Sequence, residues 1–329
     1  MDLTGAHQIY LRLQERLRAA VKGRDDVVDL VLTSLLADGH VLLEDYPGSG
    51  KTLLAKTLGD SITDDQPADE IPSFRRVQFT PDLLPSDVTG TTVFDAATSQ
   101  FQFRKGPVFT YVLLADEINR TSPKVQSSLL EAMAEKQVTV DNHTHKLDEL
   151  FFVIATQNPL DLAGTYPLPV AQLDRFLFKI RMTHVSREAE LDVLATAKER
   201  RDGVPRSMPK VGRNDIIAAR TAIYDGVKVA PAIHEGLVDV ARALRADRRV
   251  LQGASTRSLV LGLPALQSRA MTHGRDFVSP DDMEALLVPL FGHRLELAPG
   301  VDDSAPVIAE CAAPILERMA RFSMQRAAV

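Results

Sequence analysis

Residues 40–52 read His-Val-Leu-Leu-Glu-Asp-Tyr-Pro-Gly-Ser-Gly-Lys-Thr, an apolar strand followed by a glycine-rich turn and by a lysine and a threonine that open a helix. Gly48 and Gly50 allow backbone amides to curl around phosphate oxygens because no Cβ stands in the way. Lys51 can bridge the β- and γ-phosphates of a nucleotide, and the Thr52 hydroxyl can ligate Mg²⁺. This order of elements predicts a site for a nucleoside triphosphate.

The context of the turn supports this prediction, although its letters depart from the usual phosphate-loop pattern. Asp45 occupies the position of the first glycine in G-x-x-x-x-G-K-[ST]. An apolar strand precedes the turn, and a helix with Leu54 and Leu58 on one face follows it. The expected nucleotide contacts are the residues of the turn and of the helix start, namely Pro47, Gly48, Ser49, Gly50, Lys51, Thr52 and Leu53.

Two carboxylates end a second apolar strand, because residues 112–117 read Val-Leu-Leu-Ala-Asp-Glu. Beside a phosphate loop, Asp116 would hold the Mg²⁺ shell, and Glu117 would polarise water for attack on the γ-phosphate. The alternative is a strand followed by an acidic helix cap. The phosphate loop upstream favours the catalytic interpretation.

A third apolar strand, 151–155, is followed by Thr-Gln-Asn-Pro at 156–159. A polar amide such as that of Asn158 could lie between the strand ends and help to position the water. Alternatively, Asn158-Pro159 is only a turn. The spacing leaves both interpretations open.

Arg175 lies directly before the last strand of the first half of the chain. A guanidinium group has no lone pair to accept a proton, and its planar fork suits a charged transition state. A phosphate site at a sheet edge lacks an arginine of its own, so Arg175 could complete the site of a neighbouring subunit. The alternative is a surface salt bridge with Asp174 or Asp161.

The composition is that of an ordinary globular protein, with 45% hydrophobic and 25% charged residues in a chain of 329. That length suffices for two domains, each with its own core. The formal net charge of −6 makes a nucleic-acid partner an unfavourable interpretation. The single cysteine, Cys311, cannot form an intrachain disulfide, so we expect a cytoplasmic protein. No apolar run approaches the length of a membrane span, and we expect no direct membrane insertion.

Residues 1–185 alternate short apolar strands with helical patterns, which predicts an α/β domain with a parallel sheet. Ligands of such sheets bind at the carboxyl ends of the strands. The predicted strands are 40–44, 74–78, 111–116, 151–156 and 177–181, and the predicted helices are 26–38, 51–62, 122–135 and 168–175. Two inserts interrupt this domain, one at 80–110 and one at 137–150. In the second, apolar and polar residues alternate on both sides of Asp141-Asn142, which predicts a hairpin.

Residues 186–329 show only helical spacing and predict an all-α domain. The stretch 201–214 between the first two helices is the expected surface loop. The predicted helices are 187–200, 213–224, 231–245, 255–272, 280–291 and 306–323.

Taken together, the motifs resemble those of the MoxR family of AAA+ ATPases. The resemblance covers nearly the whole of 20–182. Its main motifs are Glu-Asp-x-Pro-Gly-x-Gly-Lys-Thr at 44–52, Leu-Leu-Ala-Asp-Glu-Ile-Asn-Arg at 113–120, Ala-Thr-Gln-Asn-Pro at 155–159, Gly-Thr-Tyr-Pro-Leu-Pro at 164–169 and Ala-Gln-Leu-Asp-Arg-Phe at 171–176. Further matches are Gln-Phe-Thr-Pro-Asp-Leu-Leu-Pro-Ser-Asp at 78–87, Phe-Arg-Lys-Gly-Pro at 103–107, Gly-Ala-Ser-Thr-Arg at 253–257 and His-Arg-Leu at 293–295.

The resemblance implies an AAA+ phosphate-loop domain followed by an all-α lid. It implies that the two inserts are the helix-2 insert and the pre-sensor-1 hairpin. The implied roles are Walker A for Lys51 and Thr52, Walker B for Asp116 and Glu117, sensor 1 for Asn158, arginine finger for Arg175 and sensor 2 for Arg257. Lys22 and Arg24 align with a segment that usually lines the adenine pocket, where the usual Gly-Gln is here Gly-Arg.

These observations predict a ring-forming, Mg²⁺-dependent ATPase, with ATP and Mg²⁺ as its cofactors. The family resemblance implies a homo-oligomer, a hexameric ring, that remodels or activates client proteins bearing a von Willebrand factor A domain. Two alternatives stay open on the sequence alone. One is the ATPase subunit of a metal chelatase, and the other is a binding module in which slow hydrolysis only switches the affinity for a partner.

Overall fold

The computed structural model describes residues 1–44, 49–64, 71–158, 164–197, 204–205 and 207–327. Within this part of the chain, five parallel strands form one sheet in the order β10-β1-β9-β6-β3. These strands are β1 (Val41–Glu44), β3 (Phe74–Gln78), β6 (Val112–Asp116), β9 (Phe152–Gln157) and β10 (Phe178–Arg181). The predicted parallel sheet is confirmed, and every strand boundary lies within one residue of its expected position.

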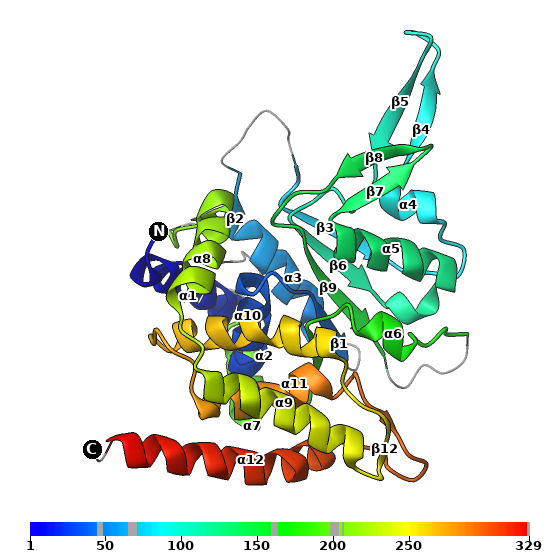
Figure 1. The fold of residues 1–329 in the computed structure, drawn as a ribbon. Helices are drawn as coiled ribbons and strands as arrows, with labels where there is room; N and C mark the ends of the chain where they lie inside the picture. The colour runs from blue at the N-terminus through cyan, green and yellow to red at the C-terminus, as the bar shows by residue number, and fades with distance from the viewer. Residues whose placement is uncertain (45–48, 65–70, 159–163, 198–203, 206, 328–329) are drawn as a thin grey trace.

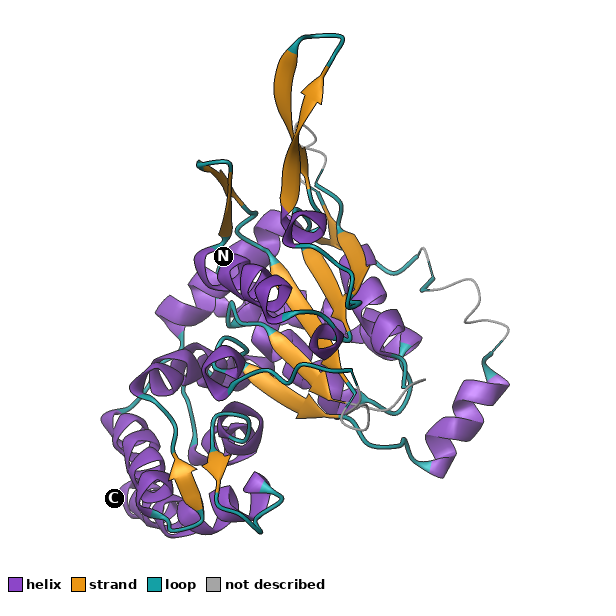
Figure 2. Ribbon diagram, turned by 90° about the vertical axis from the view of Figure 1, so that its right-hand side faces the viewer, coloured by secondary structure: helices purple, strands orange, loops and turns teal. Residues whose placement is uncertain are grey.

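Successive residues of the strands belong alternately to two hydrophobic clusters, because neighbouring side chains of a strand point to opposite faces. In β1, Val41 and Leu43 lie in one cluster and Leu42 lies in the other. Helices therefore cover both faces of the sheet (Figures 1 and 2). On the first face lie α1 (Leu3–Ala20), α2 (Asp25–Leu36) and α3 (Lys51–Asp60), and on the second lies α5 (Pro123–Glu135).

Both inserts form antiparallel hairpins that project from one end of the molecule (Figure 1). The alternation at 137–150 correctly predicts the second hairpin. Its two turn residues, Asp141 and Asn142, have φ of 50° and 64°, as a tight primed turn requires. The elements of the inserts are α4 (Pro85–Thr89), β4 (Gly90–Asp95) and β5 (Gln100–Lys105), then β7 (Gln137–Val140) and β8 (His143–Lys146).

The second half of the chain is helical, as expected, with two short additions of strand. Its helices are α7 (Arg187–Ala195), α8 (Arg213–Gly226), α9 (Pro231–Ala246), α10 (Thr256–Thr272), α11 (Pro280–Phe291) and α12 (Ser304–Ala327). The added strands are β12 (Val250–Gln252) with β13 (Glu296–Leu297), and β11 (Val211–Gly212) with β2 (Ile62–Thr63) of the first half. The expected surface loop at 201–214 therefore ends in a strand, while 198–203 and 206 lie outside the described residues. Every helix in the described ranges is too short or too polar to span a lipid bilayer.

One hydrophobic cluster continues across the predicted domain boundary at residue 185. It contains Leu17 of α1, Ile223 of α8 and Leu266 of α10. The first helix of the chain therefore packs against the second half, so that the two predicted domains share one of the hydrophobic clusters in the described residues. This packing fixes the position of the helical half relative to the sheet.

His40, which directly precedes β1, links two neighbouring elements through a buried imidazole that is 5% exposed. Its Nδ1 accepts a hydrogen bond from the backbone N–H of Val153 at 3.1 Å. The proton must then lie on Nε2, which donates to the carbonyl of Met133 at 3.3 Å. Burial lowers the pKa of His40 to about 4 from an ordinary value of 6.5, although the Met133 carbonyl partly opposes this shift.

We expect His40 to make stability dependent on pH. Because its pKa is lower in the folded chain, the unfolded chain binds the proton first as the pH falls. The stabilisation is complete above pH 6.5 and is lost towards pH 4, a change of about 3 kcal/mol in the free energy of unfolding. His40→Gln can still accept from Val153 and donate to Met133, so it should lack this contribution. Urea unfolding of both proteins over this range measures the difference, and equal pH slopes would contradict the assignment.

Candidate functional site

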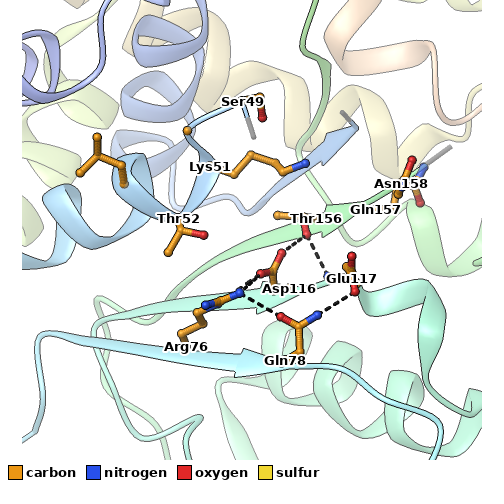
Figure 3. Close-up of a pocket in the computed structure, with 12 residues that line it drawn as sticks. Ser49, Lys51, Thr52, Arg76, Gln78, Asp116, Glu117, Thr156, Gln157 and Asn158 are labelled. Atoms are coloured by element: carbon orange, nitrogen blue, oxygen red, sulfur yellow. Dashed lines mark hydrogen bonds and ion pairs between the residues drawn. The ribbon is translucent and has the colours of Figure 1, made fainter. Parts of the chain in front are cut away.

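A cavity of about 440 Å³ lies where the carboxyl ends of β3, β6 and β9 meet the start of α3 (Figure 3). Parallel strands place their carboxyl ends at one edge of the sheet, which is why residues distant in sequence meet here. The described residues that line the cavity are Ser49, Gly50, Lys51, Thr52, Leu53, Arg76, Gln78, Asp116, Glu117, Thr156, Gln157 and Asn158.

The turn before α3 has the backbone conformation that its glycine predicts. Gly50 has φ of +93°, in the left-handed region, and forms the N-cap of α3. The space around it is open, since an added Cβ would come no closer than 4.0 Å to Val21 Cγ1. Glycine is therefore favoured at this position by the left-handed backbone conformation and not by a lack of space for a side chain. Beside it, the Ser49 hydroxyl is buried and has no hydrogen-bond partner among the described residues.

Lys51 and Thr52 form the first turn of α3, next to Leu53. The Lys51 side chain extends across the cavity toward the ends of the strands (Figure 3). Five of the seven residues predicted as nucleotide contacts thus line one cavity. The other two, Pro47 and Gly48, lie outside the described residues.

The hydroxyl of Thr156, on the neighbouring strand β9, holds the carboxylate of Asp116 and the backbone of Glu117 at the end of β6. Thr156 Oγ1 donates to Asp116 Oδ1 at 2.6 Å and accepts from the backbone N–H of Glu117 at 2.8 Å. Thr156 is 1% exposed and Asp116 is 9% exposed. One buried hydroxyl therefore fixes both the direction of the Asp116 carboxylate and the path of the chain after it.

Glu117 has a backbone conformation that is unusual for a residue with a side chain. Its φ and ψ are 58° and 50°, in the left-handed region, which costs about 1–2 kcal/mol for an L-residue. It precedes the short 3₁₀ helix η1 (Ile118–Arg120), but its side chain does not cap that helix. Instead the carboxylate is 3.2 Å from Arg120 Nε and lines the cavity. The geometry is that of a side chain turned toward a ligand site and not that of a helix cap.

Two cavity residues, Arg76 and Gln78, come from the edge strand β3 and were not singled out from the sequence. Arg76 donates to Asp116 Oδ2 from Nη2 at 2.6 Å and from Nε at 3.2 Å, and to Gln78 Oε1 at 2.9 Å. Gln78 Nε2 in turn donates to Glu117 Oε2 at 2.7 Å. The expectation that the site lacks an arginine of its own is therefore wrong. The guanidinium of Arg76 is nevertheless engaged with the Asp116 carboxylate.

The polar residues that follow β9 have different surroundings. Asn158 lines the cavity, as predicted for an amide near the strand ends. Gln157 Nε2 donates to Glu44 at the end of β1 at 2.7 Å. Burial alone would raise the pKa of Glu44, but the Lys179 ammonium at 2.8 Å and the Gln157 amide hold that pKa below its ordinary value. Glu44 thus ties together the ends of β1, β9 and β10.

Arg175 and Arg257 are not among the described residues that line the cavity. Arg175, between α6 (Val170–Leu173) and β10, donates from Nη1 to the carbonyl of Leu130 at 2.9 Å. The carboxylate of Asp174 pairs with Arg294, and Asp161 lies outside the described residues. Arg257 is exposed in the first turn of α10.

Lys22 and Arg24, the residues aligned with an adenine pocket, have other contacts in the structure. Lys22 Nζ lies 3.8 Å from Asp192 Oδ2 of α7. Arg24 is buried at the N-terminus of α2 and donates to the carbonyl of Thr183. Both residues connect α1 and α2 to the segment that follows β10.

The residues of the cavity fit a nucleoside triphosphate with its magnesium ion. The Lys51 ammonium suits phosphate oxygens, and the buried Ser49 hydroxyl has hydrogen-bonding capacity to spare. The Thr52 hydroxyl and the Asp116 carboxylate offer the oxygen ligands that Mg²⁺ prefers. Glu117 lies next to them with a carboxylate that can accept a proton.

Comparison with protein families identifies two regions of the chain. Residues 40–178 match the ATPase family associated with various cellular activities (AAA). Residues 242–310 match the AAA lid domain. The first match contains every described residue of the cavity, and the second lies within the helical half.

Individual relatives align along most of the chain. The protein YeaC of Bacillus subtilis is 45% identical over 89% of this chain and 88% of its own length. Chaperone MoxR1 of Mycobacterium tuberculosis is 36% identical over 85% of this chain and 74% of its own. A crystal structure of a protein from Cytophaga hutchinsonii superposes with a TM-score of 0.84 and 33% identity, over 94% of this chain and 95% of the other.

Thr156 offers a direct test of how the carboxylates are held. In Thr156→Val the backbone N–H of Glu117 and Oδ1 of Asp116 lose their partner, which should lower the free energy of unfolding by about 1–3 kcal/mol. Thr156→Ser keeps the hydroxyl and removes one methyl group, so it should cost only about 1 kcal/mol. Chemical denaturation at neutral pH measures both values. A valine variant as stable as the serine variant would show that the hydroxyl does not hold the two residues.

Proposed function

Because the chain belongs to the MoxR family of AAA+ ATPases, we propose that it hydrolyses ATP with Mg²⁺, assembles into a hexameric ring and remodels or activates partner proteins. One observation carries the proposal. Lys51 and Thr52, at the start of a helix, line the same cavity as Asp116 and Glu117, at the end of a neighbouring strand. This combination of groups suits phosphoryl transfer to water.

The roles of the residues follow from their chemistry and position. Lys51 holds the phosphates by charge, and the amides of the turn at 48–52 surround them. Thr52 and Asp116 would hold Mg²⁺, which would supply charge neutralisation at the phosphate oxygens. Glu117 accepts a proton from the attacking water, and Asn158 orients that water from the adjacent strand end.

We assign Arg175 to the site of a neighbouring subunit. Among the described residues that line the cavity, the arginine is Arg76, and the Asp116 carboxylate at 2.6 Å already balances its charge. Besides Lys51 and Mg²⁺, a guanidinium that no carboxylate neutralises would stabilise the charge that develops on the γ-phosphate. Arg175 lies away from its own cavity and retains donors beyond the one that binds Leu130, so a ring in which it reaches the next cavity supplies that cation. Arg257, at the start of α10, reports the state of the nucleotide to the lid.

The client is expected to be a protein with a von Willebrand factor A domain, bound in the cytoplasm. The β4–β5 hairpin supports a role in binding protein, because its Phe94 and Phe101 are 52% and 73% exposed and contact each other edge to face at 5.2 Å between ring centres. Exposed apolar side chains that gather on a surface can mark a site of protein interaction. The name of the relative MoxR1 as a chaperone agrees with this role.

Glu117→Gln tests the proposed chemistry directly. The amide keeps the size and the polarity of the side chain but cannot accept a proton, so ATP hydrolysis should fall by about 10²–10⁴-fold. ATP binding should be retained, because the phosphates are held by other residues. Single-turnover hydrolysis and binding of a fluorescent ATP analogue measure the two properties separately.

Lys51→Ala is the companion variant, since its ATP binding should weaken by about 10–150-fold while the fold is retained. Loss of one charge-assisted contact lowers the binding free energy by about 1.5–3 kcal/mol. Normal hydrolysis in Glu117→Gln would show that another group accepts the proton from the attacking water. Normal ATP affinity in a folded Lys51→Ala protein would refute the site itself.

A further inference from the structure

The segment 174–177, which carries Arg175, is held by a buried arginine of the helical half. Arg294, at the turn after α11, has a side chain that is 2% exposed. Its Nε donates to Asp174 Oδ1 at 2.6 Å. Its terminal nitrogens donate to the backbone carbonyls of Asp174 at 3.3 Å, Phe176 at 2.7 Å and Leu177 at 3.1 Å. One side chain of the lid therefore fixes both a carboxylate and the backbone on either side of Arg175.

A second element of the lid contacts the same carboxylate. Ser258 Oγ donates to Asp174 Oδ1 at 3.2 Å, and Ser255 Oγ lies 3.5 Å from Oδ2. Ser255 is the N-cap of α10, and Arg257 lies between the two serines in the first turn of that helix. Asp174 is thus the point at which the start of α10 and the turn after α11 meet the segment before β10.

Arg175 faces the other side of this segment. Its Nη1 donates to the carbonyl of Leu130 in α5, the helix that leads into the β7–β8 hairpin. The side chains of consecutive residues thus point in different directions, with Asp174 toward the lid and Arg175 toward α5. Because Arg294 binds both the Asp174 carboxylate and the backbone carbonyls on either side of Arg175, a movement of Arg294 with the lid acts on the backbone of Arg175 as well.

We propose that Asp174 is a positioning residue through which the lid of one subunit sets the direction of Arg175 in the active site of the next. The inference rests on the proposed function, specifically on the action of Arg175 across a subunit boundary. It adds a route by which Arg257, on α10, and the finger residue are coupled within one chain. Asp174 itself need not touch nucleotide in either subunit.

Mixtures of inactive variants separate this role from a role in the subunit's own site. Asp174→Ala alone should keep its ATP affinity but lose about 10²-fold in hydrolysis rate, as expected when a positioned group moves by about 1 Å. Mixed with Lys51→Ala, it should regain activity, because an intact phosphate loop then meets an intact Asp174–Arg175 segment. Mixed with Arg175→Ala, it should stay inactive, because neither subunit supplies a well-placed finger.

The opposite pattern would overturn the proposal. If Asp174 acts on its own subunit's cavity, Arg175→Ala should rescue it and Lys51→Ala should not. Undiminished activity of Asp174→Ala alone would overturn it too. The control mixture of Arg175→Ala with Lys51→Ala contains no substitution at Asp174. If only this control is active, the neighbour-shared site stands and the assignment of Asp174 fails. If the control is inactive in rings shown to be mixed, the shared site itself fails and Asp174 loses its proposed target.

Because Asp174→Ala leaves the buried Arg294 without its carboxylate, folding is checked by thermal unfolding and ATP binding. Should the variant not fold, Ser258→Ala supplies the same test. Ser258 is a fully buried residue whose truncation removes the shorter of the two contacts between the start of α10 and Asp174, and it leaves the pair between Asp174 and Arg294 in place. A smaller loss of rate with rescue by Lys51→Ala alone supports the proposal. An unchanged rate, or rescue by Arg175→Ala, contradicts it.

Discussion

Parallel pairing of β1, β9, β6 and β3 places four polar strand ends on one edge of a sheet, and the candidate site depends on this register. Gln78 lies opposite Asp116, and Ala115 lies opposite Ala155. A shift of one residue would turn Asp116 to the other face and bury a charge in the cluster that contains Leu113. The register of the paired strands therefore determines where the carboxylates point, as well as how the sheet packs.

The strand ends are tied laterally by side chains, and these ties extend from the edge strand to the far side of the sheet. Arg76 and Thr156 hold Asp116 from opposite neighbours. On the other side of the sheet, Glu44 pairs with Lys179 and accepts a hydrogen bond from Gln157. A ligand entering the cavity thus meets groups whose positions are already set, which lowers the cost of ordering them on binding. The left-handed backbone of Glu117 belongs to the same arrangement, since the Thr156 hydroxyl holds the strained residue in place.

Much of this arrangement could be predicted from the sequence, because the relevant signals are local. Each central strand is a short apolar run, and Lys51, Thr52, Asp116 and Glu117 follow such runs directly. Arg76 and Gln78 could not be assigned in this way. They share one face of an alternating strand, but which neighbour that face meets is decided by strand order. The only local signal is that the two residues are two positions apart in the chain, which places them on the same face of a strand.

Contacts between residues far apart in the chain could not be predicted either. Arg294 and Asp174 are 120 residues apart, and nothing near Arg294 in sequence distinguishes a buried arginine from a solvated one. Strands β12 and β13 contain three and two residues, too few for periodicity to indicate them. The packing of α1 against the helical half could not be predicted for a similar reason. An amphipathic pattern shows that a helix has a buried face, but it does not show which element covers that face.

We propose that Arg175 of one subunit completes the cavity of the next. The most direct measurement is the ATPase rate per subunit over a wide range of protein concentrations, with sedimentation velocity on the same samples. If Arg175 acts in this way, the rate per subunit should rise steeply with concentration and follow the fraction of protein in rings. A rate per subunit that stays constant while sedimentation shows monomers at one end of the range and rings at the other would contradict it.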